Sequence, residues 1–388
     1  MDIGTHSVKG VQMSRSSGHL RVDCAGYALV DRNQLNLDPV ACQAKALREA
    51  IRSMAVAQSL IVGSLPGHTV VIRYPRLPEM PLDSLDAAVE REAGQHIPYE
   101  LSEVFLDSTL LETVTEGEDR LHKVLLVAAK HDVIDARVQI ADAAEIEYSV
   151  LGVDSLALAD AAEGCDFLRV GETVALVNIG LSSTSVHFVK DGVSSFIRDV
   201  SWGARELIQA IARGRRCDYE EAERLLCRAA MDETAAAAPF EEEAKAGEER
   251  ATGSTLLDPF EEELEAAGPS AEGPPGETGG GALEKGLGEI LSSPLSRLVN
   301  EVRRSFEYYE HELYESPVDR LILSGGVAHL PVLSSTLGEE LGLRSLEVAN
   351  PLESALFWGD DEAVAPLAER PAQFMVAVGL AARGMADL

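Results

Sequence analysis

The sequence predicts an α/β protein made of two related domains that face each other across a ligand-binding cleft. The first observation is a strand at 174–177 that leads through the turn Gly180-Leu-Ser-Ser-Thr184 into a second strand at 185–189. An apolar run without in/out alternation is typical of a strand covered on both faces. The second observation is a copy of this hairpin at the start of the chain, where Asp2-Ile3-Gly4 aligns with Asn178-Ile179-Gly180. A hairpin that recurs with its glycine in register indicates two related domains.

A third element of the same kind lies far downstream. A strand at 320–323 leads into Gly325-Gly326 and then into a helix at about 331–341. The hairpin glycines let a ligand approach the backbone, and the amides and hydroxyls that follow are donors suited to phosphate. The paired glycines let a nucleoside lie against the backbone beside a helix N-terminus. Each hairpin alone is better explained as an ordinary turn with a polar tip, but the three in this order indicate a nucleotide cleft.

The remainder of the first half is predicted to alternate between helices and strands. After the opening strands come a helix at 41–56, strands at 61–65 and 70–74, a helix at 83–96, strands at 104–112 and 122–130, and a helix at 132–145. Pro75, Pro78 and Pro81 interrupt the chain. The segment 73–147 is expected to form an inserted subdomain, although a purely structural insert explains its residues equally well. The chain begins almost where its first strand ends, so we expect a longer native N-terminus or a neighbour that covers this gap.

The second half is predicted to contain a long acidic interruption. Its other elements are helices at 203–212 and 218–230, a long helix at 291–314, a strand at 346–348 and a terminal helix at 374–383. Residues 229–288 hold 15 acidic and 3 basic side chains, which is −12 of the net charge of −32. Such a composition buries too little apolar surface to fold, so this insertion is predicted to be disordered. The insertion contains the sequence Pro-Phe-Glu-Glu-Glu twice, at 239–243 and 259–263. This repeat is either a docking motif or a chance result of sequence drift in a low-complexity segment.

Composition excludes several classes of function. A net charge of −32 argues against nucleic-acid binding and against electrostatic adhesion to anionic lipid. The five cysteines are scattered without a CxxC pair, which indicates reduced thiols and makes a structural zinc site unexpected. No apolar run approaches the roughly 20 residues of a membrane span, and no signal peptide opens the chain. We therefore expect a soluble, cytoplasmic protein.

Seven blocks of the sequence resemble a known family. They are Asp2-Ile-Gly-Thr-His-Ser-Val-Lys9, Arg76-Leu-Pro-Glu-Met-Pro81, Gln95-His-Ile-Pro-Tyr-Glu-Leu-Ser-Glu-Val104, Asn178-Ile-Gly-Leu-Ser-Ser-Thr184, Tyr219-Glu-Glu-Ala-Glu-Arg-Leu225, Leu323-Ser-Gly-Gly-Val-Ala-His-Leu-Pro331 and Phe374-Met-Val-Ala-Val-Gly-Leu-Ala-Ala-Arg-Gly384. Together they resemble the PilM family of type IV pilus assembly proteins, within the actin-like ATPase superfamily. The second and third blocks separate PilM from more distant relatives such as the cell-division protein FtsA. The resemblance covers nearly the whole chain except about 229–288.

The resemblance implies an actin-like, ribonuclease H-like fold with duplicated domains, a nucleotide cleft, a small α+β insert in the first half and the disordered insertion in the second. The expected division is 1–72 and 148–170 for the first domain, 73–147 for the insert, 171–200 and 316–370 for the core of the second domain, 201–315 for its small subdomain, and 371–388 for a C-terminal helix that packs on the first domain.

The resemblance also implies a set of site residues for ATP and Mg²⁺. The phosphate contacts would come from Gly4, Thr5, His6, Ser7, Lys9, Gly180, Ser182, Ser183 and Thr184. The nucleoside contacts would come from Glu223, Gly325 and Gly326, and the metal would be held through water by Asp2 and Asn178. Asp154 would orient the attacking water. Lys9 is better explained as a solvent or strand-face residue, Asp154 as a helix N-cap, and Glu223 equally well as part of a solvated helix face.

Three positions depart from the family pattern. The second metal-site residue is usually acidic, and an amide at Asn178 carries no charge, so metal affinity should fall. Asp154 stands where relatives tend to have Glu and is one methylene shorter. Leu226 replaces a lysine that often contacts the nucleotide. These departures favour ATP binding with slow hydrolysis at most.

The predicted function is that of a cytoplasmic ATP-binding adaptor associated with the inner membrane through its partners. The resemblance implies that it binds the N-terminal cytoplasmic peptide of the platform protein PilN in a groove that the insert helps to form. Other pilus components and self-association are further expected partners. The alternatives are a sugar or acetate kinase, which lacks an acceptor motif here, a nucleotide-free pseudo-ATPase scaffold, and the equivalent component of a type II secretion system.

Overall fold

The computed structural model describes residues 1–16, 19–54, 59–117, 119–231 and 286–386. Most of the predicted disordered insertion, including both Pro-Phe-Glu-Glu-Glu repeats, lies outside these residues. Its predicted ends are wrong, because helix α7 continues to Met231 and helix α8 begins at Leu287. None of the helices in the described parts of the chain is long and apolar enough to cross a membrane.

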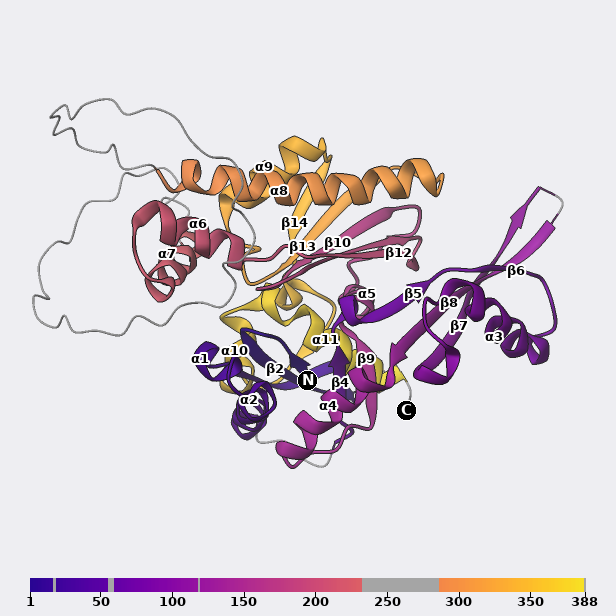
Figure 1. Cartoon of the computed structure of the whole chain (residues 1–388), viewed down its shortest axis with the longest axis horizontal. Coiled ribbons are helices and arrows are strands. Elements are labelled where there is room, and N and C mark those ends of the chain that lie inside the picture. Colours follow the sequence, from indigo (N-terminus) through magenta and orange to yellow (C-terminus); the bar gives the residue numbers. More distant parts are fainter. Residues whose placement is uncertain (17–18, 55–58, 118, 232–285, 387–388) are drawn as a thin grey trace, which may run out of the picture.

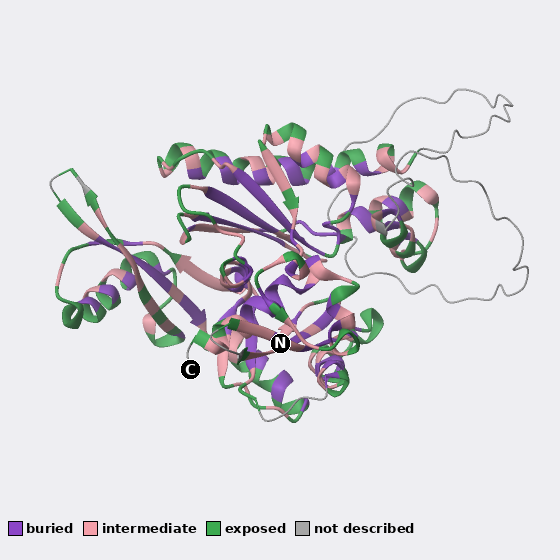
Figure 2. Cartoon of the chain, turned by 180° about the vertical axis from the view of Figure 1, so that it is seen from behind, coloured by how far each residue is buried: buried purple, intermediate pink, exposed green. Residues whose placement is uncertain are grey.

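The second half is built on a five-stranded sheet, which we call the second sheet. It consists of β10 (Thr173–Ile179), β11 (Thr184–Lys190), β12 (Val193–Val200), β13 (Arg320–Gly325) and β14 (Ser345–Val348), in the order β12-β11-β10-β13-β14. Ala175 and Val177 point into one core cluster and Val174 and Leu176 into another. This burial on both faces explains the uniformly apolar run of the first strand. In Figure 2, β10, β11 and β13 are almost entirely purple, whereas β12 and β14 are mostly pink.

The first half repeats this strand order in two pieces, which together we call the first sheet. One piece is β1 (Asp2–Ile3), β2 (Ser7–Ser16), β3 (His19–Leu29) and β15 (Phe357–Trp358), and the other pairs β4 (Val62–Leu65) with β9 (Val150–Val153). With only two residues, β1 forms no ladder with β4. The Met1 amino group instead donates to the Val62 carbonyl at 2.6 Å. The order β3-β2-β1-β4-β9 therefore matches that of the second sheet.

The insert is a separate sheet that projects to one side of the molecule (Figure 1). It contains β5 (Val70–Arg73), β6 (Arg76–Pro78), β7 (Val104–Glu116) and β8 (Asp119–Lys130), with helix α3 (Leu85–His96) packed on one face. The proline-rich break predicted after 74 is partly wrong, because β6 pairs antiparallel with β8. The following helix α4 (His131–Ala143) places Ile140 in the core cluster of helix α2 (Pro39–Ser53).

Four helices share a core cluster with one face of the second sheet. Helices α6 (Arg205–Arg215), α7 (Tyr219–Met231), α8 (Leu287–Glu307) and α9 (Pro331–Leu341) belong to the second half, and α8 runs along the sheet (Figure 1). The helix predicted at 291–314 ends in a π-helical turn at Tyr308–Glu312. Short helices not predicted are α1 (Arg32–Leu35) and α10 (Asp361–Ala368).

The terminal helix α11 (Met375–Ala386) returns to the first half. Its buried face shares a core cluster with helix α5 (Asp154–Gly164) and with Val11 and Val22 of the first sheet. A Cβ at Gly379 would collide with the Ala157 carbonyl, so this glycine permits the close approach of the two helices.

Candidate functional site

The two predicted hairpin turns have the same backbone geometry. Gly4 N donates to Ser7 O at 3.1 Å, and Gly180 N donates to Ser183 O at 2.9 Å. A Cβ would lie 3.0 Å from the Ser7 carbonyl oxygen in the first turn and 3.1 Å from that of Ser183 in the second. Each turn therefore favours glycine for the same steric reason. The alignment of the two hairpins holds at atomic detail.

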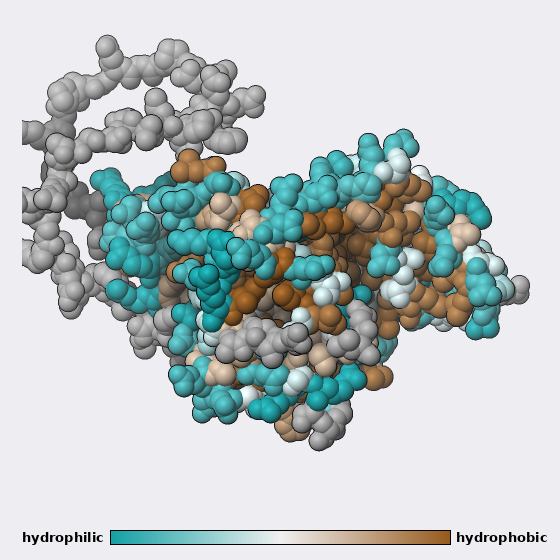
Figure 3. Space-filling model, turned by 90° about the horizontal axis from the view of Figure 1, so that it is seen from below, coloured by the Kyte–Doolittle hydropathy of each residue, from teal (hydrophilic) through white to brown (hydrophobic). Residues whose placement is uncertain are grey.

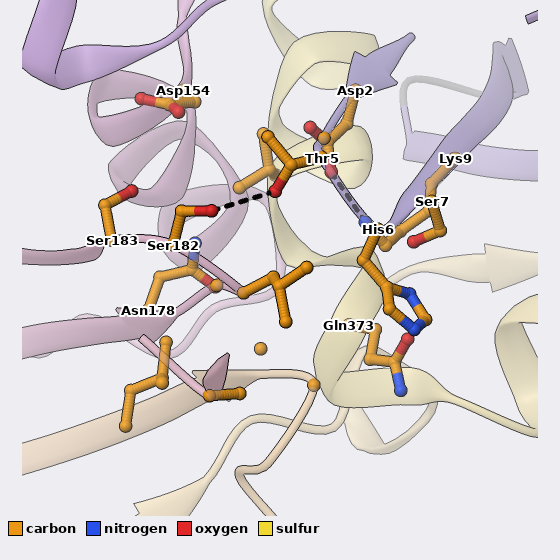
Figure 4. Close-up of a pocket in the computed structure, with 18 of the residues that line it drawn as sticks. Asp2, Thr5, His6, Ser7, Lys9, Asp154, Asn178, Ser182, Ser183 and Gln373 are labelled. Atoms are coloured by element: carbon orange, nitrogen blue, oxygen red, sulfur yellow. Dashed lines mark hydrogen bonds and ion pairs between the residues drawn. The ribbon is translucent and has the colours of Figure 1, made fainter. Parts of the chain in front are cut away.

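The two turns face each other across one cleft. Thr5 Oγ1 and Ser182 Oγ are 3.3 Å apart and join the turns directly (Figure 4). The cleft, of about 240 Å³, is lined by most of the predicted site residues: Asp2, Gly4, Thr5, His6, Ser7, Lys9, Asp154, Asn178, Gly180, Ser182, Ser183, Glu223, Gly325 and Gly326. Thr184 is not among them. Its side chain is fully buried, and its hydroxyl donates to the Trp202 carbonyl at 2.8 Å.

At the ends of β1 and β10 lie the two predicted metal-site residues. Asp2 Oδ2 accepts from Lys9 Nζ at 3.0 Å, with both side chains largely buried. The solvent-facing explanation of Lys9 is therefore wrong, because Lys9 neutralises Asp2 inside the cleft, while its position on a strand, β2, is as expected. Asn178 Oδ1 accepts from Ser324 Oγ at 3.2 Å. The first turn thus presents a paired carboxylate where the second presents a neutral amide.

Asp154 is not the N-cap of helix α5. The N-cap position is Val153, and Asp154 is the first helical residue. Its Oδ1 accepts from Gly67 N at 2.7 Å, which fastens the start of α5 to the loop after β4. Burial raises the pKa of Asp154 to about 7, and the charges of Asp199 and Asp2 act in the same direction. Near neutral pH this carboxyl group is therefore only partly ionised.

Sequence reasoning missed several residues of the cleft. Asp199 of β12, Arg137 of α4 and His68 all line it, although none belongs to a sequence block that pointed to the site. Burial raises the pKa of Asp199 and lowers that of Arg137. Among the described residues, no three His, Cys, Asp or Glu side chains are grouped to hold a metal ion. Asp199 could have been found only from strand register, because it is separated from Asn178 by 21 positions.

The predicted nucleoside contacts Glu223, Gly325 and Gly326 line the same cleft. Glu223 Oε1 is 2.9 Å from His6 Nε2, so α7 is joined to the first turn. Gly325 has φ +102°, and a Cβ there would clash with the Ile179 backbone. A Cβ on Gly326 would meet no described atom within 4 Å, which leaves open space beside the backbone. Leu226 is buried and also lines the cleft.

Comparison with known proteins identifies the family. The family model described as type IV pilus assembly protein PilM matches residues 1–244 and 283–385. The chain belongs to the PilM family. A chain from the solved PilM–PilN type IV pilus biogenesis complex is 23% identical, with a TM-score of 0.71 and coverage of 99% of this chain and 97% of that one. The predicted actin-like fold with duplicated halves is confirmed by this fold similarity and by the repeated strand order.

More distant solved structures share less of the geometry with this PilM protein. The ethanolamine utilization protein EutJ from Carboxydothermus hydrogenoformans is 13% identical, with a TM-score of 0.47 and coverage of 98% of this chain and 87% of that one. The archaeal actin homolog Ta0583, solved in complex with ADP, is 14% identical, with a TM-score of 0.42 and coverage of 99% of this chain and 97% of that one.

Proposed function

We propose that this PilM protein is an ATP-binding adaptor of type IV pilus assembly that binds the N-terminal cytoplasmic peptide of the platform protein PilN. The proposal that the protein binds ATP rests on one observation, the pair of matched turns that meet across one cleft. Residues of both turns line the same space, and the hydroxyls of Thr5 and Ser182 meet in it (Figure 4). A polyphosphate placed there would receive donors from both halves, so ATP would hold the halves together.

The nucleoside would lie at the Gly326 end of the cleft. The open space beside that glycine and the apolar side chains of Ile208, Leu226 and Val327, which line the same cleft, suit a planar base. Glu223 would contact the ribose or the base in exchange for its hydrogen bond to His6. The missing lysine at position 226 removes one contact and should weaken affinity.

The cleft also fits a Mg²⁺ ion that accompanies the phosphates. Asp2 and Asn178 would hold it through water, and the ion would neutralise phosphate charge. Asp2 is already paired with Lys9, so part of its charge is compensated within the protein. A pKa of about 7 suits a general base, but Asp154 Oδ1 is already engaged by the Gly67 amide, and the group is only partly ionised near neutral pH. Hydrolysis would accordingly be slow or absent.

The partner peptide would bind in a groove beside the insert. A cleft of about 840 Å³ separates β5, β6 and β8 of the insert from β12 and the π-helical turn. A second hollow, of about 460 Å³, runs between β2 and α11 and is lined by apolar side chains such as Met13, Leu60 and Met385. Seen from below, hydrophobic surface gathers around a hollow between the body and the insert (Figure 3). Bound to PilN, the protein would work at the cytoplasmic face of the inner membrane.

The test is to measure bound nucleotide and partner affinity on the same protein. Nucleotide released by denaturing purified protein is identified by chromatography, and calorimetry follows ATP and a PilN N-terminal peptide. We expect ATP binding and tighter peptide binding with ATP present. Ile72→Glu, in the groove of the insert, and Leu60→Glu, in the second hollow, then show which surface holds the peptide. If neither variant loses peptide binding, the proposal of a peptide groove at these surfaces is contradicted.

A nucleotide-free scaffold is the second candidate, which Asn178 and Leu226 favour because both remove a nucleotide contact. It predicts no ATP in the purified protein and no heat on ATP addition, while the PilN peptide still binds. No peptide binding with ATP bound would instead point toward another machine of the same fold, such as type II secretion.

A further inference from the structure

We propose that Asp199 and Asp154 hold a divalent cation in the cleft, and that Asp199 supplies the carboxylate missing at position 178. As a partner for ATP this cation rests on the proposed function, but the two carboxylates exist whether or not nucleotide binds. Asp199 would then belong to the site although it lies two strands away from the expected metal-site residue.

Strand register places Asp199 in line with Asn178. Asn178 of β10 is opposite Ser185 of β11, and Ser185 is opposite Asp199 of β12. Residues directly opposite on neighbouring strands project from the same face of a sheet. Asn178, Ser185 and Asp199 all line the cleft, as this register requires.

The first half has an equivalent row of directly opposite residues on three neighbouring strands, but its charged residues stand on different strands of the row. There Asp2 of β1 is opposite Lys9 of β2, and Lys9 is opposite Tyr27 of β3. Asp2 thus corresponds to Asn178, Lys9 to Ser185 and Tyr27 to Asp199. The second half keeps one carboxylate in its row but carries it on the third strand, and it has no lysine there to neutralise it.

Asp199 and Asp154 approach each other around Gly67. A Cβ added to this glycine would lie 2.6 Å from Asp199 Oδ2 and 2.9 Å from Asp154 Oδ1. It would also lie 2.8 Å from Ser155 Oγ, a fully buried hydroxyl that has no hydrogen-bond partner within the described part of the chain. Three oxygen atoms therefore converge on one glycine, and one of them is a buried polar atom without a partner.

The charges around Asp199 and Asp154 favour a bound cation. Lys9 is occupied by Asp2, and the charge of Arg137 acts on Asp2 and Asp154. His68 is the basic group that faces Asp199. Two half-buried carboxylates that approach each other each disfavour the other's ionised form, and a bound cation would stabilise both as carboxylates. Mg²⁺ commonly takes one or two carboxylates and fills its other positions with water and phosphate oxygens, which suits this arrangement.

The test is a Mn²⁺ titration of the full chain, followed by electron paramagnetic resonance, with nucleotide absent. Wild type should show one site that is tighter than the weak background from acidic surface residues. Asp199→Asn should weaken that site by roughly tenfold or more, a loss of the size seen when a group that supports a metal is removed. Asp107→Asn, an exposed carboxylate on the insert, is the matched control and should keep the site. Equal Mn²⁺ affinity in wild type and Asp199→Asn would overturn the proposal and leave a shared proton as the explanation of the pair.

A second measurement separates this proposal from the nucleotide function. ATP binding is measured in EDTA, where Asp199→Asn should bind at least as tightly as wild type because it has lost a negative charge. If ATP fails to bind wild type while Asp199→Asn loses Mn²⁺, the cation site stands without the nucleotide function. If ATP binds wild type and Asp199→Asn leaves the Mn²⁺ affinity unchanged, the proposed cation site is contradicted and the nucleotide function stands. Thermal unfolding checks that each variant folds, and Asp154→Asn repeats the test from the other carboxylate.

Discussion

His6 Nε2 and Glu223 Oε1 lie 2.9 Å apart, and their hydrogen bond connects the first turn to helix α7 of the second half. With the contact between Thr5 and Ser182, it makes a second polar link across the cleft. Both links use residues that the family resemblance assigns to the nucleotide. A ligand that takes these groups must therefore replace contacts that the protein makes with itself.

The first prediction uses His6→Ala and Glu223→Ala to test whether Glu223 contacts ATP or only holds His6. If Glu223 contacts the nucleoside and His6 contacts phosphate only through its backbone amide, His6→Ala frees Glu223 and should raise ATP affinity a few-fold, while Glu223→Ala should lower it. Each hydrogen bond involved is worth about 1 kcal/mol, or roughly fivefold in affinity. Calorimetry with ATP decides this. Equal losses in both variants would show that Glu223 serves only to hold His6.

The second prediction contrasts the neighbouring glycines at 325 and 326. Gly325→Ala places a Cβ against the Ile179 backbone at φ +102°, so it should lower the free energy of unfolding by about 2 kcal/mol or more. Gly326→Ala enters open space and should change stability by less than about 1 kcal/mol. If a nucleoside occupies that space, Gly326→Ala should nevertheless weaken ATP binding. Urea unfolding and calorimetry on both variants supply the comparison, and unchanged ATP affinity in Gly326→Ala would place the nucleoside elsewhere.

The third prediction concerns pH and Asp154. Its pKa is raised from 3.8 to about 7, so the folded protein keeps a proton that the unfolded chain has released between these values. Stability from this group is therefore present at low pH and is lost as pH rises toward 7. From about pH 5.5 to 8, wild type should lose about 2 kcal/mol relative to Asp154→Asn, at about 1.4 kcal/mol per pKa unit. Denaturant unfolding of both proteins in EDTA measures it; parallel pH curves would mean that Asp154 is not perturbed.

The fourth prediction restores a charge at the second turn. Asn178→Asp returns the carboxylate to β10, so Mg²⁺ should raise ATP affinity more in this variant than in wild type, by roughly tenfold. Phosphate release should also rise if the metal position is what limits it. Asn178→Ser, which removes the amide without adding charge, is the control. No gain in Mg²⁺ dependence would indicate that the metal does not approach β10.

The duplication was predictable from the sequence because a turn glycine and its flanking strands leave a local pattern. Gly4 and Gly180 could be aligned without any knowledge of packing. Asp199 could not be found this way, since its place depends on how β12 registers against β11. The N-cap role expected for Asp154 was wrong for a similar reason: its partner, the Gly67 amide, is 87 positions away.

Local sequence patterns also predicted the wrong secondary structure at places where tertiary contacts determine it. The prolines after position 74 predict a break in the chain, yet Pro78 ends a short strand, β6, that pairs with β8. The segment of helix α10 has a polar start and contains Pro366, which argues against a helix, yet Val364 and Leu367 are buried there. The π-helical turn after α8 has no sequence marker. Phe188 stacks on Tyr309 of this turn with ring centroids 4.4 Å apart, a contact visible only once the sheet is in place.

The return of α11 to the first half governs the order in which the protein can be completed during synthesis. Val376, Ala377 and Leu380 fill the same core as Ala157 and Ala161 of α5, so that core stays open until α11 has left the ribosome. The second sheet needs no strand residue beyond Val348 and can form earlier. The half that is made first is thus finished last, and nascent chains should expose its apolar surface to chaperones for most of their translation.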